Sequence, residues 1–272
     1  MTIQNYLKEK KQLIDEELDR YLPTEKEYPQ SIHQAMRYAV LGDGKRVRPI
    51  LAISACEACG GSLEEVLPVA CGIEMIHAYS LIHDDLPALD NDDYRRNRPS
   101  CHKAFNEATA ILAGDALLTL GLRLFGLLSD CKVCCAVLET MTQAVGTYGM
   151  IGGQVIDLEV KPADRDQPTL EYIHTRKTGA LIAASVKIGA VVAGATDETI
   201  EKLTRFGEYI GLVFQIVDDI LDNEDYAILF GPAKAGEEAK HLTQRAKEQI
   251  AFLGARAERL NQIADMLVAR VK

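Results

Sequence analysis

LTRFGEYIGLVFQIVDDILD, residues 203–222, is the stretch of sequence that decides the fold. Its apolar residues recur three or four positions apart, which places their side chains along one face of an α-helix. The run ends in DDILD, where Asp218 and Asp222 are four residues apart and therefore share a helical face. The segment predicts a long buried helix with an acidic end. The apolar positions are Leu203, Phe206, Ile210, Val213 and Val217.

A second apolar run, with Ile73, Ile76, Tyr79 or Ser80, and His83 at helical spacing, leads into DDLPALD at residues 84–90. Pro87 predicts the end of that helix at Asp84 and Asp85, so that Asp90 returns from the following turn. Strand-like alternation is hard to find elsewhere in the chain. We therefore expect an all-α protein with two acidic helix ends, which face one cavity if the two helices pack side by side.

Composition excludes several classes of protein. The 272 residues are 47% hydrophobic and 26% charged, as in a soluble globular chain, and no linker divides them, so we expect one domain over residues 1–272. A net charge of −10 argues against nucleic-acid binding, which needs a basic face. The N-terminal segment lacks a long apolar stretch, which predicts a cytoplasmic protein with no stable membrane anchor. Seven cysteines, an odd number, favour reduced thiols.

Both acidic clusters suit a hard metal ion. Like charges one helical turn apart destabilise a helix unless something compensates, and carboxylate oxygens are what Mg²⁺ selects. A solvated acidic helix end is the alternative for either cluster alone. The EF-hand spacing is missing from the first cluster, and the cysteine pairs, including Cys56 and Cys59, lie in apolar helical contexts that argue against a zinc site.

Basic residues accompany the acids. Arg95 and Arg96 directly follow the first cluster, and guanidinium groups bind phosphate oxygens bidentately. In GDGKRVRP, residues 42–49, two glycines allow a tight turn beside Lys45 and Arg48, although the spacing is not that of a Walker A loop. Together these groups predict a site for a diphosphate that is already bound to metal, with surface salt bridges as the alternative.

Read in order, several motifs resemble the trans-prenyltransferase (polyprenyl diphosphate synthase) family, and most closely the bacterial farnesyl diphosphate synthases. The resemblance covers roughly residues 42–222. It implies an isoprenoid-synthase fold, which is an antiparallel helical bundle around a deep central cavity, usually as a homodimer that uses Mg²⁺. The motifs are GDGKRVRP, HAYSLIHDDLPALDNDDYRRNRPSCHKAF, AILAGDALLT, GMIGGQVIDL, RKTGALI and FQIVDDILD.

The resemblance also implies roles for single residues. Isopentenyl diphosphate would be held by Lys45, Arg48, His77 and Arg96. The allylic diphosphate, dimethylallyl or geranyl, would contact Arg95, Lys177, Thr178 and Gln215. Mg²⁺ would bind Asp84, Asp85 and Asp90 on one side and Asp218, Asp219 and Asp222 on the other. Asp84, Asp85, Asp90, Lys177, Asp218 and Asp219 are the catalytic residues expected on this basis.

In this family the residues just before the first aspartate motif commonly set product length. Here they are Tyr79 and Ser80, and the ring of Tyr79 favours a short product such as farnesyl diphosphate, with core packing as the other interpretation of that ring. Geranyl or geranylgeranyl diphosphate synthesis, a terpene cyclase and a non-catalytic partner subunit of such a synthase are the alternatives. The separate basic residues argue against a cyclase, which has no second diphosphate to bind.

One segment departs from the family pattern. After DDILD, family members usually have a loop that bears glycine and lysine, whereas here residues 223–226 lead almost directly into AILFGPAKAG. Either the protein lacks this loop or the 272 residues omit part of it. A missing loop would impair closure over the allylic diphosphate, because such lids exclude water.

Overall fold

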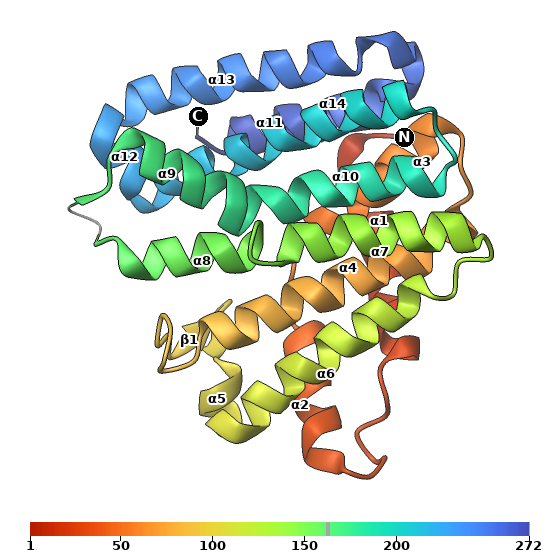
Figure 1. The fold of residues 1–272 in the computed structure, drawn as a ribbon, viewed down its shortest axis with the longest axis vertical. Coiled ribbons are helices and arrows are strands. Elements are labelled where there is room, and N and C mark those ends of the chain that lie inside the picture. Colours follow the sequence, from red (N-terminus) through yellow and green to blue (C-terminus); the bar gives the residue numbers. More distant parts are fainter. Residues whose placement is uncertain (162–163, 272) are drawn as a thin grey trace. The chain divides into compact units, whose positions relative to one another are not determined.

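The computed structural model describes residues 1–161 and 164–271 (Figure 1), and helices make up 78% of the structure. The chain separates into two compact units. The first unit comprises residues 1–50 and 67–134, and the second comprises residues 51–66 and 135–272. The expectation of one domain over residues 1–272 stays a prediction.

The first unit is helical apart from one short hairpin. Its helices α2 and α5 pack against α6, and β1 pairs with β2 in antiparallel register. The elements that lie wholly in this unit are α1 (Ile3–Tyr21), α2 (Gln30–Val40), β1 (Tyr94–Arg95), β2 (Arg98–Pro99), α5 (Cys101–Ala104) and α6 (Glu107–Phe125). Three helices continue from one unit into the other: α3 (Val47–Cys59), α4 (Leu63–Asp84) and α7 (Cys131–Val145).

The second unit is built around the long helix α11. It packs against α10, α13, α14 and η2, so it is covered on several sides (Figure 1). The elements are α8 (Met150–Glu159), α9 (Gln167–Ile173), the π-helix η2 (His174–Gly179), α10 (Ala180–Val192), α11 (Asp197–Asp222), α12 (Asp225–Phe230), α13 (Pro232–Gln249), η3 (Ala251–Ala257), α14 (Glu258–Val268) and η4 (Ala269–Val271).

Helix α11 confirms the sequence-based prediction. Thr196 caps its N-terminus by accepting a hydrogen bond from the backbone N–H of Thr199, and Asn223 ends the helix in the left-handed region with φ of 57°. All five residues of the predicted apolar stripe are fully buried. A Cβ added at Gly211 would lie 2.7 Å from Cα of Gly179, so the absence of a side chain there allows α11 to approach η2 closely.

Helix α4 is confirmed as well. It ends at Asp84, just before Pro87, and the backbone N–H of Asp90 donates to the carbonyl of Asp84 at 2.9 Å, so the chain turns back as predicted. Helices α4 and α6 are long and apolar enough to cross a membrane by length and composition, but buried core helices of soluble proteins pass the same test. The structure gives the seven cysteines as free thiols.

The connection after the second aspartate cluster is short. Only Asn223 and Glu224 lie between α11 and α12. The backbone N–H of Glu224 donates to the carbonyl of Asp219 at 2.9 Å, so this connection is a tight turn at the end of α11.

Candidate active site

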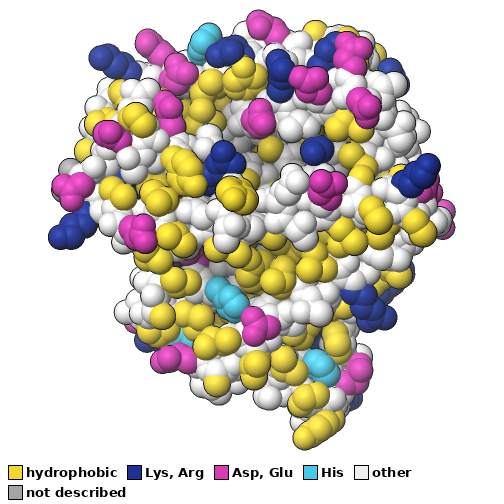
Figure 2. Space-filling model, in the orientation of Figure 1, with side chains coloured by type: hydrophobic (Ala, Val, Ile, Leu, Met, Phe, Trp, Pro, Cys, Tyr) yellow, Lys and Arg dark blue, Asp and Glu magenta, His cyan; other side chains and the backbone are white. Residues whose placement is uncertain are grey.

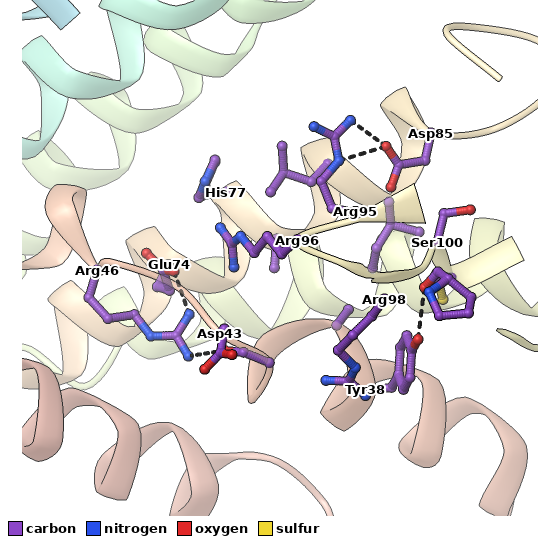
Figure 3. A pocket seen from close by; sticks show the side chains of 17 residues that line it. Tyr38, Asp43, Arg46, Glu74, His77, Asp85, Arg95, Arg96, Arg98 and Ser100 are labelled. Atoms are coloured by element: carbon purple, nitrogen blue, oxygen red, sulfur yellow. Dashed lines mark hydrogen bonds and ion pairs between the residues drawn. The ribbon is translucent and has the colours of Figure 1, made fainter. Parts of the chain in front are cut away.

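A basic pocket lies within the first unit (Figure 3). It is lined by the Gly42–Arg46 turn, one face of α4, and the β1–β2 hairpin. At the tip of the hairpin Arg96 and Asn97 both have positive φ, 53° and 61°, as the two-residue hairpin turn of type I′ requires. Arginine rarely adopts this backbone conformation, and such strain is concentrated at functional sites.

Arg46 organises the wall of this pocket. Its side chain is 1% exposed, and it donates from Nη1 to Oε1 of Glu74 at 2.8 Å (Figure 3). Its Nε donates to Oδ1 of Asp15 at 2.7 Å. Nη2 donates to the carbonyls of Val40 and Gly42 at 2.8 and 3.2 Å. Desolvation lowers the pKa of Arg46, but the carboxylates of Glu74 and Asp15 outweigh it and raise that pKa overall. The guanidinium therefore ties the turn to α4.

His77 and Arg48 meet in the same unit. Nη1 of Arg48 lies 3.2 Å from Nε2 of His77. Desolvation, and then the positive charges of Arg48, Arg96 and Arg46, hold the pKa of His77 well below its usual value of 6.5. The imidazole is therefore neutral at pH 7 and accepts a hydrogen bond from Arg48. Lys45, on the preceding turn, is exposed.

This shift in pKa predicts a pH dependence. Below pH 6.5 the unfolded chain binds a proton at His77 that the native protein does not bind, so stability falls as the pH drops from 6.5 toward the lower native pKa. The slope from one such group is at most about 1.4 kcal/mol per pH unit. Urea unfolding between pH 7.5 and 5 should show a shallower loss for His77→Gln than for the wild type. The exposed His241 gives the control, His241→Gln, which should keep the wild-type slope; equal slopes for all three proteins would contradict the prediction.

The three aspartates of the first cluster differ in their exposure to solvent. Asp84 is partly buried and Asp90 is exposed, whereas Asp85 is 2% exposed. Burial raises the pKa of Asp85, and the hydrogen bonds and charge of Arg95 partly oppose that rise. Nε of Arg95 donates to Oδ1 of Asp85 at 2.9 Å, and Nη2 of Arg95 also bonds Asp85 and Asp92. In this conformation Arg95, predicted to contact the allylic diphosphate, is therefore paired with two acids.

The second cluster lies at the end of α11 in the second unit. Asp218 is partly buried and pairs with Nη1 of Arg270 at 2.8 Å, and Asp222 is exposed. Asp219 is 3% exposed and accepts from the side chain of Gln215 at 2.7 Å and from the backbone N–H of Tyr226 at 3.1 Å. Nε2 of the buried His174 lies 3.3 Å from Oδ2 of Asp219, the oxygen that accepts from Tyr226. Asp218 and Asp222 are thus more accessible to a ligand than Asp219.

Lys177 belongs to a second group of charges in this unit. Its Nζ donates to Oδ2 of Asp157 on α8 at 2.6 Å, and Arg165 donates to Oδ1 of the same carboxylate at 2.6 Å. Arg165 also donates to Asp225 at 2.8 Å. Lys177 lies on the π-helix η2, and π-helical turns are frequent at functional sites. Thr178 follows it and is partly buried.

The acids suit a metal that arrives together with its ligand. Among residues 1–161 and 164–271 there is no group of three or more acidic, histidine or cysteine side chains close enough to enclose an ion. Mg²⁺, however, is usually bound by one or two carboxylates plus phosphate oxygens, so the predicted donors do not have to form a closed site. Asp90 and Asp222 are exposed and Asp84 and Asp218 are only partly buried, so a ligand can reach these four residues. The metal role of Asp219 has the least support because Asp219 is buried and its oxygens already accept protein hydrogen bonds.

The two residues predicted to set product length lie on α4. Tyr79 is 6% exposed, and its ring packs edge-on against His83 with centroids 5.6 Å apart. Ser80 is partly buried and donates to the carbonyl of His77 at 2.9 Å. The ring of Tyr79 is therefore held in place five residues before Asp84.

Several residues of these two sites escaped the sequence analysis. Asp157 and Arg165 have structural partners that are far apart in sequence. Asp157 stands three residues after Gln154 in the motif GMIGGQVIDL, which is a spacing that shares a helical face and was a usable signal. Arg98 was visible as the third arginine of RRNR.

Solved structures resemble the protein over nearly its whole length. A crystal structure of an apo FPP/GFPP synthase from Zymomonas mobilis superposes with a TM-score of 0.93 at 36% identity and covers 98% of both chains. A geranyltransferase from Legionella pneumophila gives a TM-score of 0.91 at 34% identity, with 99% of this chain and 97% of the other covered. The protein therefore has the all-α isoprenoid-synthase fold and belongs to the trans-prenyltransferase class.

Sequence comparison identifies the family. The polyprenyl synthetase family matches residues 29–231. A geranylgeranyl diphosphate synthase from Cyanophora paradoxa is 38% identical over 288 aligned positions, covering 97% of this chain and 95% of the relative. A heterodimeric geranylgeranyl pyrophosphate synthase large subunit from Arabidopsis thaliana is 42% identical, over 90% of this chain and 73% of the relative. The chain belongs to the polyprenyl synthetase family.

Proposed function

We propose that the protein condenses isopentenyl diphosphate with an allylic diphosphate in a Mg²⁺-dependent reaction and releases pyrophosphate. The observation that carries this proposal is the basic pocket of the first unit: Arg96 and His77 line it and Arg48 hydrogen-bonds to His77, so this unit offers guanidinium groups for a second diphosphate. An enzyme that ionises a single diphosphate has no use for that second site. Elongation therefore explains the site better than cyclisation does.

Separate groups of residues bind the two diphosphates. Lys45, Arg48 and Arg96 bind the diphosphate of isopentenyl diphosphate, and neutral His77 orients Arg48 as its hydrogen-bond acceptor. The diphosphate that departs from the allylic substrate is bound by Lys177, which Asp157 holds, by Thr178 and Gln215, and by Arg95. Bound Mg²⁺ supplies positive charge that stabilises this leaving group.

The condensation breaks one bond of the allylic substrate and forms a new carbon–carbon bond. The C–O bond of the allylic diphosphate breaks and its electron pair leaves with pyrophosphate. The double bond of isopentenyl diphosphate attacks the allylic cation, and loss of a proton restores a double bond in the longer chain. Exclusion of water protects the cation from hydrolysis.

Farnesyl diphosphate is the product we propose, because Tyr79 presents a bulky, fixed ring close to the first aspartate cluster. A specific observation favours geranylgeranyl diphosphate as a second candidate: the Cyanophora and Arabidopsis relatives carry that name. Incubation with Mg²⁺, isopentenyl diphosphate and dimethylallyl or geranyl diphosphate, followed by chromatography of the products, decides between them. Absence of turnover with every allylic starter would refute the proposed function.

Substitution of Tyr79 tests the role of its ring in product length. In Tyr79→Ala the main product is expected to gain at least one five-carbon unit, because removal of the buried ring opens space before Asp84. Chromatography of products from matched reactions measures this. Tyr94→Ala, at an exposed tyrosine on β1, is the control and should leave product length unchanged. A Tyr79→Ala enzyme with the wild-type product would show that the ring serves only packing.

We also propose a cytoplasmic homodimer. The exposed apolar side chains Ile111 and Leu112 on α6, 43% and 55% exposed, support an interface on that helix. Light scattering of the purified chain tests the dimer, and a mass of one chain at micromolar concentration would refute it.

Lys and Arg side chains are interspersed with Asp and Glu on the face shown in Figure 2, which gives nucleic acid no basic patch on that face.

A further inference from the structure

The arginines of the basic pocket differ in whether they form an ion pair with an acidic side chain. Arg46 is paired with Glu74 and Asp15, and Arg95 is paired with Asp85 and Asp92. Arg96 and Arg98 line the same pocket and form no ion pair with an acid in the part of the chain that the structure describes. Two guanidinium groups are therefore available to an anionic ligand. Of the two, only Arg96 has a proposed substrate, isopentenyl diphosphate.

Arg98 is held in place although it has no acidic partner. Its guanidinium carbon lies 4.0 Å from the centroid of the Tyr38 ring, within the range of a cation–π contact. A Cβ added at Gly42 would lie 3.1 Å from Nη1 of Arg98, so the guanidinium packs directly against the backbone of the Gly42–Arg46 turn. Among the described residues no hydrogen-bond acceptor meets its N–H groups, and these contacts fix the direction in which the groups point.

Tyr38 is itself a rigid support. Its hydroxyl donates to the carbonyl of Pro99 at 2.8 Å (Figure 3). Its ring packs edge-on against Phe105 with centroids 5.5 Å apart. The hydroxyl thus fastens α2 to strand β2 one residue beyond Arg98, while the face of the ring carries the guanidinium. The Arg98 side chain has many rotamers. It is held in one of them without an ion pair because its contacts with Tyr38 and the Gly42–Arg46 turn offset the lost conformational entropy.

We propose that Arg98 is a further binding residue for the diphosphate of isopentenyl diphosphate, and that Tyr38 is the positioning residue that orients it. The inference rests on the proposed function of the pocket and extends it to two residues that the family resemblance gives no role. Arg98 lies opposite Arg95 in the β1–β2 pairing, so one hairpin presents three functional arginines, with Arg96 at its tip. Arginine matches phosphate oxygens through its planar fork of donors, which lysine cannot reproduce.

Steady-state kinetics with each substrate varied in turn tests the proposal. A hydrogen bond between charged groups that is lost on substitution corresponds to about tenfold to hundredfold in affinity. Arg98→Met should therefore raise the KM for isopentenyl diphosphate by about that factor, with kcat and the KM for the allylic diphosphate within about twofold of the wild type. Arg98→Lys keeps the charge but loses the planar fork of donors, so its KM for isopentenyl diphosphate should lie between those of the wild type and Arg98→Met. Arg123→Met, at an exposed arginine on α6, is the matched control.

Tyr38 gives an independent measurement. Tyr38→Leu removes the platform and should raise the same KM, whereas Tyr38→Phe keeps the ring and should stay near the wild type. Because Tyr38 acts through Arg98, the double variant Tyr38→Leu/Arg98→Met should be no worse than Arg98→Met alone. Additive effects would overturn the positioning role, since they would mean that Tyr38 acts by another route.

Titration calorimetry with isopentenyl diphosphate alone separates this inference from the proposed function. Weaker binding by Arg98→Met and Arg98→Lys supports the inference even if no allylic starter is turned over, in which case only the proposed function fails. Normal turnover by the wild type together with unchanged affinity in Arg98→Met would overturn the inference and leave the function intact. An equal rise of both KM values in Arg98→Lys would also overturn it, because that result indicates a general disturbance of the fold.

Discussion

Asp84→Asn is expected to lower kcat by about 10²- to 10³-fold, the loss typical when one preorganised electrostatic group that acts on a developing charge is removed. Asp84 is the last residue of α4 and is only partly buried, so a metal–diphosphate ligand can reach it. Asparagine keeps the shape but not the charge. The measurement is kcat at saturating substrates over a range of Mg²⁺ concentrations, and the variant should also require more Mg²⁺ for half of its maximal rate.

Asp93→Asn is the matched control for this experiment. Asp93 belongs to the same acidic stretch, but it pairs with Lys103 at 2.8 Å on the surface and has no proposed role in metal binding. The control should keep its rate within about twofold, because exposed ion pairs contribute little. If Asp84→Asn kept the wild-type rate and the wild-type Mg²⁺ requirement, Asp84 would not be a metal ligand.

Asp218→Asn is expected to give a loss of the same order through the second cluster. In this structure Asp218 pairs with Arg270, which has to release the carboxylate before a metal binds there. Arg270→Gln therefore serves as the contrasting variant: it should leave kcat unchanged or lower the Mg²⁺ concentration that the enzyme needs. A severe loss of rate in Arg270→Gln would show instead that Arg270 takes part in catalysis.

Arg46→Met is expected to lower the free energy of unfolding by about 3–5 kcal/mol, the range found when one partner of a buried ion pair is removed. Arg46 and Glu74 expose 1% and 4% of their side chains, so the substitution leaves the Glu74 carboxylate buried without its cation. Two backbone carbonyls also lose their donor. Urea unfolding at pH 7 measures the loss, read from the midpoint at an unchanged slope.

A double variant measures how much the buried charges of Arg46 and Glu74 contribute to stability. In Arg46→Met/Glu74→Gln no buried charge remains at this position, so part of the lost stability should return. Lys11→Met is the control, because Lys11 also pairs with Asp15 but is 39% exposed; its effect should stay below about 1 kcal/mol. A loss for Arg46→Met as small as that of the control would mean that the buried pair contributes nothing to stability.

Much of the local structure followed from the sequence because its causes are local. Helical periodicity predicted α4 and α11, and Pro87 predicted the return of the chain at Asp90. The motifs that resemble the trans-prenyltransferases predicted the fold that the solved structures confirm. The farnesyl product and the roles of single residues stay predictions, because they depend on the size of a cavity and on ligands that sequence motifs do not measure.

The sequence by itself determined the class of fold, the two acidic helix ends and the presence of a cluster of arginines. Only the tertiary structure decided which of those arginines are already paired. Arg46 meets Glu74 across 28 residues of chain, whereas Arg98 meets the face of Tyr38 and no acid among the described residues. The physical reason is that helix formation depends on neighbours within a few residues, while the pairing of a charge depends on groups that folding brings together from distant segments.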